Sequence, residues 1–132
     1  MRVLISGAGE VGFRVARDLV YRGHEVTLID SSSSAVKRAQ TLDAQVFQGN
    51  GSSAKFLLET ASIKEVDLFI GVTGNDAVNI VGCSLAKKFG NDTIARLNKS
   101  EMIDLPLDYD HKELFGVDAF VSPDELAMHR IW

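Results

Sequence analysis

A group of glycines near the start of the chain carries the strongest chemical signal in the sequence. Residues 7–12 read Gly-Ala-Gly-Glu-Val-Gly, which fits G-x-G-x-x-G, and they follow the apolar run Val3–Ile5. In this pattern the first glycine permits a tight turn, the second lets the backbone approach a pyrophosphate, and the third lets a helix lie close to the strand. The helix N-terminus then offers free N–H groups and partial positive charge to phosphates. The residues predicted to form this nucleotide site are Gly7, Ala8, Gly9, Glu10, Val11 and Gly12.

An acidic residue at the end of the next apolar run supplies the second part of the signal. Asp30 lies 18 residues after Gly12, close to the spacing of about 20 found in dinucleotide-binding folds. Its carboxylate can accept hydrogen bonds from both hydroxyls of an adenosine ribose, and Ser31 follows it directly as a further candidate. No arginine occurs at residues 31–34 to receive a 2′-phosphate. The sequence therefore favours NAD or NADH over the phosphorylated cofactors, while ATP or ADP would satisfy the same contacts.

Two later turns are expected at the same edge of the sheet, where ligands of such folds bind. The first, residues 48–52, would border the adenine, and its asparagine could hydrogen-bond the edge of the base; a plain turn is the alternative. The second, residues 72–76, opens a helix, so its backbone could meet the phosphates or a second ribose. The candidates are Asn50 and Gly51 in the first turn, Thr73 and Gly74 in the second, and Asn79, expected to face the same crevice one helical turn later.

Redox or hydrolytic chemistry would need an acid, base or nucleophile near the ligand. None of the three histidines, His24, His111 and His129, falls at the carboxyl end of a predicted strand. Glu10 is interpreted as a side chain turned to solvent that complements the helix dipole. The sequence therefore offers no candidate catalytic residue, and nothing in it resembles a catalytic triad or a metal site.

Short apolar runs alternate with longer amphipathic segments, which is typical of a parallel sheet covered by helices on both faces. With right-handed crossovers, this predicts an α/β fold: a Rossmann-type, doubly wound sheet of about six strands. The predicted strands are Val3–Ile5, Val26–Ile29, Gln45–Phe47, Leu68–Val72, Thr93–Ala95 and Ala119–Val121. The predicted helices are Val11–Arg22, Ala35–Leu42, Ala54–Ala61, Asp76–Phe89, with Val78, Val81, Leu85 and Phe89 on one face, and a short one at His111–Phe115.

The length of 132 residues, with 45% hydrophobic and 24% charged residues, fits one soluble domain and excludes a complete two-domain dehydrogenase. Residues 1–121 are predicted to form the nucleotide-binding domain, and residues 122–132 the start of a C-terminal crossover helix.

Residues 98–132 hold three basic and eight acidic groups, whereas residues 1–97 hold eleven basic and ten acidic groups. This acidic tail argues against nucleic acid as a partner. A single cysteine and the lack of a membrane-length apolar run indicate a reduced cytoplasmic compartment.

Several segments, in order, resemble the RCK or KTN family, the NAD-binding N-terminal domains of TrkA-type regulatory subunits in Trk/Ktr potassium uptake systems. The resemblance implies a cytoplasmic gating subunit and not an enzyme, peripheral to the membrane, that binds NAD(H) or ATP/ADP. It also implies pairing into homodimers, assembly into rings and contact with a membrane potassium transporter or channel subunit. The family's C-terminal regulatory domain is missing, which suggests a fragment or an isolated module. The segments are residues 7–12, 48–52, 72–79, 86–96 and 116–124.

By the same resemblance, Gly7–Val11 and Asp30 hold the pyrophosphate and ribose, and Thr73–Gly74 lies beside the nucleotide. Arg96 stands where the family has an arginine after the fifth strand, reaching a phosphate or the neighbouring subunit; a salt bridge within the fold is the alternative. Helix 76–89 and the acidic end of the chain are candidate pairing surfaces. Two other functions remain open: the cofactor-binding half of an NAD-dependent oxidoreductase, and the sensor domain of another cation transporter.

Overall fold

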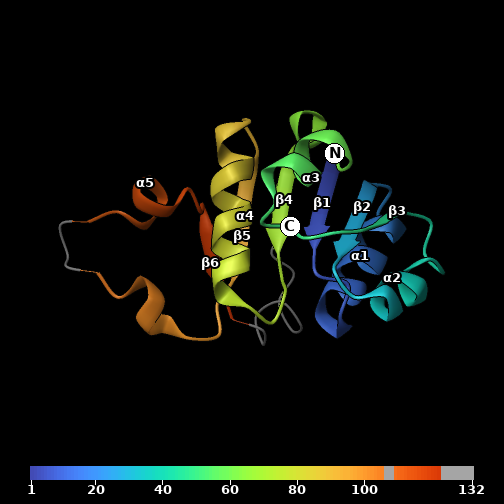
Figure 1. Cartoon of the computed structure of the whole chain (residues 1–132), viewed down its shortest axis with the longest axis horizontal. Coiled ribbons are helices and arrows are strands. Elements are labelled where there is room, and N and C mark those ends of the chain that lie inside the picture. Colours follow the sequence, from blue (N-terminus) through green and yellow to red (C-terminus); the bar gives the residue numbers. More distant parts are fainter. Residues whose placement is uncertain (106–108, 123–132) are drawn as a thin grey trace.

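The computed structural model describes residues 1–105 and 109–122, and its centre is a six-stranded sheet in the order β3-β2-β1-β4-β5-β6 (Figure 1). All five strand pairs are parallel. The predicted Rossmann-type fold is confirmed, and each strand overlaps its expected position. The strands are β1 (Arg2–Ser6), β2 (Glu25–Asp30), β3 (Gln45–Gln48), β4 (Leu68–Gly71), β5 (Asp92–Arg96) and β6 (Ala119–Val121).

Helices connect the strands and begin where the sequence offers capping side chains. Ser32, Ser53 and Asn75 accept hydrogen bonds from the first-turn N–H groups of the helices that follow them. The sequence did not predict the two 3-10 turns, and the helix expected from residue 122 lies outside the described residues. Among those residues, no helix combines the length and apolar character needed to cross a bilayer. The helices are α1 (Glu10–Tyr21), α2 (Ser33–Ala39), α3 (Ala54–Glu59), α4 (Asp76–Lys88) and α5 (His111–Phe115), with 3-10 turns η1 (Ile63–Glu65) and η2 (Ser100–Ile103).

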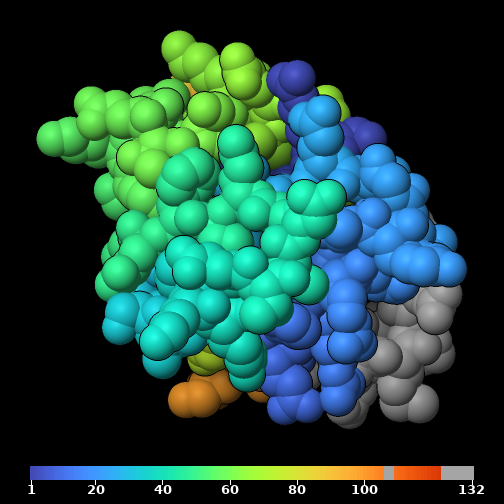
Figure 2. Space-filling model, turned by 90° about the vertical axis from the view of Figure 1, so that its right-hand side faces the viewer, coloured from blue at the N-terminus to red at the C-terminus, as the bar shows by residue number. Residues whose placement is uncertain are grey.

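The sheet buries both faces, so its central strands are apolar at successive positions. One core joins α1 and α2 to alternate residues of the strands, such as Ile5 and Leu28. The other joins α3, η1, α4 and the segment around α5 to the intervening residues, such as Leu4 and Phe69. Strand β3 forms one free edge, and Figure 2 views the molecule from this side, with the region around residues 40–50 in cyan to teal. The two cores fix the sheet between two helix layers.

The buried face of α4 differs from the predicted one. Its buried positions include Ile80, Cys83 and Ala86, whereas Val81 is 44% exposed. The cause is a close approach of helix and sheet: a Cβ on Gly82 would lie 2.7 Å from the Phe69 ring. Small side chains therefore face the sheet, and part of the larger apolar set faces outward.

Asp118 ties the last strand to α4 and β5. Both carboxylate oxygens accept hydrogen bonds from Lys87 Nζ at 2.9 Å, and the Thr93 N–H donates to Oδ2 at 2.8 Å. Partial burial raises the pKa of Asp118, but hydrogen bonds from Lys87 and Thr93 and the nearby charges of Lys87 and Lys112 together hold that pKa below its ordinary value. The ionised carboxylate therefore stabilises the folded state.

Replacing Asp118 by Asn should lower the free energy of unfolding at pH 7 by about 1–2 kcal/mol, because charged hydrogen bonds are lost. A carboxyl whose pKa falls on folding stabilises the fold above its unfolded pKa, and that stability is lost as the pH drops through the folded pKa. The difference between wild type and variant should therefore shrink below about pH 4. Urea denaturation between pH 2.5 and 7 measures it, with the exposed Asp92→Asn as control. A difference that stays constant over this range would contradict the assignment.

Candidate functional site

The candidate site lies at the carboxyl edge of the sheet, where β1 sits between β2 and β4 and the chain order reverses. Open parallel sheets bind ligands at such switch points because the connections diverge there. A hollow of about 400 Å³ occupies this position, lined by the turns that follow β1, β2, β3 and β4, and by Arg96 at the end of β5. The topology therefore brings together the turns that the sequence singled out.

The glycine turn sets the start of α1 against β1. Gly7 has a φ of +115°, and a Cβ there would lie 2.8 Å from the Thr73 nitrogen. A Cβ on Gly12 would overlap the Gly7 carbonyl oxygen, so only glycine lets the helix approach so closely. Gly9 is the N-cap residue and provides no side-chain cap, and a Cβ on it would meet nothing within 4 Å. The first N–H groups of α1 therefore have no capping side chain beside the hollow.

Asp30 is held rigidly at the end of β2. Its Oδ2 accepts a hydrogen bond from the Ala8 N–H at 2.7 Å, and its Oδ1 accepts one from the Ser32 N–H at 2.8 Å. A carboxylate oxygen can accept more than one hydrogen bond, so the group keeps acceptor capacity toward the hollow, which it lines. Asp30 thus fixes the glycine turn and offers the acceptors predicted for a ribose.

Arg38 holds the same turn from the other side, and sequence reasoning missed it. Its guanidinium donates to the Ala8 carbonyl at 3.0 Å and lies 5.3 Å from the centre of the Phe13 ring. Arg38 comes from α2 and is 30 residues from Ala8 in the chain. A contact over that separation leaves no periodic signature in the sequence.

Asn79 lies beneath the hollow and does not line it, in contrast to the prediction. Its side chain is fully buried. Its Oδ1 accepts from the N–H and Oγ1 of Thr73 at 2.9 and 2.7 Å, and its Nδ2 donates to the carbonyls of Thr73 and Arg96, each at 3.0 Å. Asn79 therefore fastens the turn after β4 to the end of β5.

Asn50 and Glu10 both line the hollow, with their side chains partly engaged. The Asn50 Oδ1 accepts from the N–H and hydroxyl of Ser52 at 2.8 and 2.7 Å, so its oxygen is engaged within the turn. Glu10 pairs with Arg14 at 3.0 Å, and both side chains are more than half exposed. This matches the interpretation of Glu10 as a solvent-facing side chain at the helix start.

The predicted residues fall into two groups. Ala8, Gly12 and Asn79 lie behind the surface of the hollow and support it. Neighbours of the predicted residues, such as Ser6, Asn75 and Val78, complete the lining. The predicted residues that line the hollow are Gly7, Gly9, Glu10, Val11, Asp30, Ser31, Asn50, Gly51, Thr73, Gly74 and Arg96.

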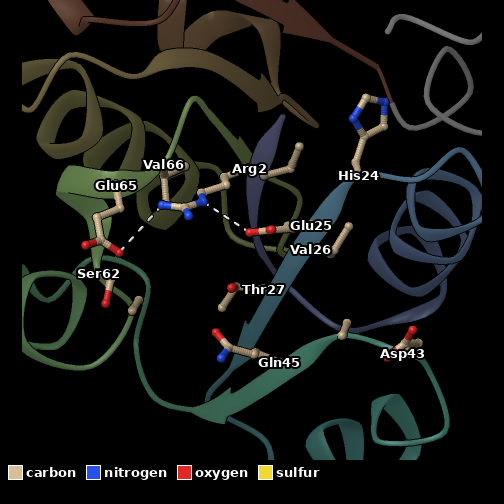
Figure 3. A pocket seen from close by; sticks show the side chains of 13 residues that line it. Arg2, His24, Glu25, Val26, Thr27, Asp43, Gln45, Ser62, Glu65 and Val66 are labelled. Carbon is tan, nitrogen blue, oxygen red and sulfur yellow. Dashed lines mark hydrogen bonds and ion pairs between the residues drawn. The ribbon is translucent and has the colours of Figure 1, made fainter.

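A larger hollow of about 640 Å³ lies at the opposite edge of the sheet (Figure 3). There Arg2 pairs with Glu25 at 3.1 Å and Glu65 at 3.9 Å. The lining contains no glycine, and the helices α1, α2 and α3 present their C-terminal ends at this edge, which disfavour an anion. Its greater volume therefore does not make it the better nucleotide site.

Candidate catalytic side chains lie elsewhere. Burial raises the pKa of the Cys83 thiol to about 12, so it is not a nucleophile at neutral pH. His111 Nε2 lies 2.8 Å from the Ile103 carbonyl, away from the hollow. Within residues 1–105 and 109–122, no group of His, Cys, Asp and Glu side chains is arranged to hold a metal ion.

Known proteins resemble this chain in sequence and in fold. The sequence matches the TrkA-N domain family over residues 3–123. It is 38% identical, over 97% of its length, to the Trk system potassium uptake protein TrkA homolog 2 of Methanosarcina mazei, and spans 29% of that protein. The GsuK RCK domain structure is 25% identical with a TM-score of 0.73, covering 92% of this chain and 25% of that one. The AMP-bound form of the Shewanella denitrificans Kef CTD is 25% identical with a TM-score of 0.71, covering 92% and 71%.

Two alanine substitutions should separate structural from surface glycines in the turn. Gly12→Ala forces a methyl group into the Gly7 carbonyl, and should lower the free energy of unfolding by about 3 kcal/mol or prevent folding. Gly9→Ala meets only open space, with φ at −69°, and should lower the free energy of unfolding by no more than about 1 kcal/mol, the cost of alanine at an N-cap. Thermal and urea denaturation followed by circular dichroism measure both. Equal losses in the two variants would contradict the described turn.

Proposed function

The chain belongs to the TrkA-N family, and on that premise we propose that it is the nucleotide-binding regulatory domain of a potassium uptake system. The observation that carries the proposal is the N-terminus of α1, which lacks a capping side chain and borders the hollow beside Asp30. Uncapped N–H groups bind phosphate, and the fixed carboxylate accepts from ribose hydroxyls. Among the described residues that line the hollow, no comparable arrangement supports catalysis. In this proposal the domain acts as a ligand-dependent switch.

The proposed ligand is an adenine nucleotide, with NAD or NADH preferred. Its phosphates meet the glycine turn, its ribose meets Asp30, and its adenine faces the NH2 group of Asn50. The AMP-bound Kef CTD, similar to this chain at 25% identity, supports an adenosine phosphate as the class of ligand. Among the described lining residues, Arg96 is the one cation beside two acidic side chains, Glu10 and Asp30. This balance favours the few charges of a dinucleotide or AMP over a triphosphate, because like charges repel.

The proposed output is a change in how copies of the domain pair, transmitted to a membrane potassium transporter or channel subunit. A nucleotide shifts such an equilibrium only by its difference in affinity for the two states. The pairing surface proposed is the outward face of α4 with α5, where Val81 and Leu114 are 44% and 55% exposed. Homodimers, or rings built from them, would cover these apolar side chains. The domain would then work in the cytoplasm, held at the membrane by its partner.

Calorimetric titration with NADH, NAD, AMP and ATP tests the binding site. Asp30→Asn should weaken NADH binding about tenfold to a hundredfold, because charged hydrogen bonds to the ribose are lost. Gly9→Ala should weaken it at least tenfold while the fold stays intact, since its methyl group occupies the space of the pyrophosphate. The exposed Asp43→Asn, in the opposite hollow, is the matched control and should bind normally. Wild-type protein that binds none of the four nucleotides would refute the proposed function.

Size-exclusion chromatography with light scattering tests the pairing surface. Val81→Glu places a charge on the outward face of α4, and should lower the mass of the wild-type assembly toward that of a monomer. Leu58→Glu, at a similarly exposed apolar position on α3 (39% exposed), is the control and should leave the mass unchanged. A monomeric wild type at high concentration, or equal effects of both substitutions, would contradict this surface.

A further inference from the structure

Arg96 brings positive charge to the hollow, and its orientation depends on a chain of contacts. Its carbonyl accepts from the buried Asn79 Nδ2 at 3.0 Å, which fixes its backbone. Its Nε donates to the Asn98 Oδ1 at 3.2 Å. The guanidinium has five N–H donors, so this contact orients it and leaves donors for a ligand. Asn98 is exposed and needs a partner of its own to hold that position.

Asp76 provides that partner. Its Oδ1 accepts from the backbone N–H and the side-chain Nδ2 of Asn98, both at 2.8 Å. Its Oδ2 accepts from the Lys99 N–H at 2.8 Å. The residue is only 7% exposed and lies in the first turn of α4, where the helix dipole favours a negative charge. All three N–H groups point at a single carboxylate, which therefore sets the path of the chain after β5.

Asp76 is not among the residues that line the hollow. Its three hydrogen bonds go to Asn98 and Lys99, which follow Arg96 in the chain. The Asn98 side chain in turn accepts a hydrogen bond from Arg96. Asn98 Nδ2 also donates to the Gly74 carbonyl at 3.4 Å, a longer contact with the turn after β4. The shorter contacts lead from Asp76 through Asn98 to the guanidinium.

We propose that Asp76 is a positioning residue for phosphate recognition. It holds Asn98 so that Asn98 turns the Arg96 guanidinium toward the phosphate of a nucleotide in the hollow. The proposal rests on the proposed nucleotide site. It adds that the Asp76 carboxylate, which does not line the hollow, affects the affinity for the phosphate group of the nucleotide. The affinity for the nucleoside part does not depend on it.

The test compares AMP, titrated by calorimetry, with adenosine, measured by displacement of fluorescent NADH, on the full chain. Asp76→Asn should weaken AMP binding about tenfold, equivalent to about 1.4 kcal/mol, and leave adenosine binding within about twofold. Asn98→Ala removes the same link at an exposed position and should act in the same direction, even if Asp76→Asn folds poorly. Arg96→Gln should lose the AMP preference, and adding Asp76→Asn to it should cost nothing more.

The outcomes are separable. Equal losses for AMP and adenosine in both variants would make Asp76 a structural residue only and overturn the proposal. Additive losses in the double variant would do the same, because Asp76 would then act without Arg96. Wild-type protein that binds AMP no better than adenosine would overturn this inference and leave the nucleotide site standing. Failure of NADH and AMP to bind wild-type protein would refute the proposed function itself.

Discussion

The contact between the start of α1 and the end of β1 is the constraint on which the rest of the site depends. Gly12 lies against the Gly7 carbonyl so closely that no other residue fits. This contact aims the helix N-terminus at the carboxyl edge of the sheet. It goes with the sharp turn at Gly7, where a Cβ would clash with the turn after β4 at Thr73. Two glycines thus place the start of the helix close to both central turns.

Hydrogen bonds from polar side chains fix the positions of the other turns relative to that contact. Asp30 ties the glycine turn to the start of α2 through the Ala8 and Ser32 N–H groups. Asn79 ties the turn after β4 to the end of β5. Buried polar groups stabilise a single arrangement when all their hydrogen bonds are made. The hollow is therefore shaped before any ligand enters, and a ligand meets groups that are already oriented.

The sequence predicted the strands and the glycine turn because both depend on local patterns. Apolar runs bounded by turns identify buried strands, and G-x-G-x-x-G identifies a backbone shape that few other sequences allow. The supporting residues Arg38, Asp76 and Asn98 escaped notice because their partners lie far away in the chain. Asn79 was expected in the crevice because it lies one helical turn from the start of α4. Its sequence position does not reveal that its side chain is hydrogen-bonded to the loop after β4. The face of α4 was misjudged because its close packing uses small residues, which a search for large apolar side chains overlooks.

Helix α4 connects the hollow to the outward face of the molecule. Asn79 and Asp76, in its first turns, are hydrogen-bonded to the turns after β4 and β5. At its other end, Lys87 pairs with Asp118 just before β6. A helix of 13 residues held at both ends moves as one rod, since its backbone hydrogen bonds resist bending. Under the proposed function, a ligand-dependent shift of these turns would pass along α4 to the exposed Val81. The helix that anchors the site would then also carry the proposed pairing surface.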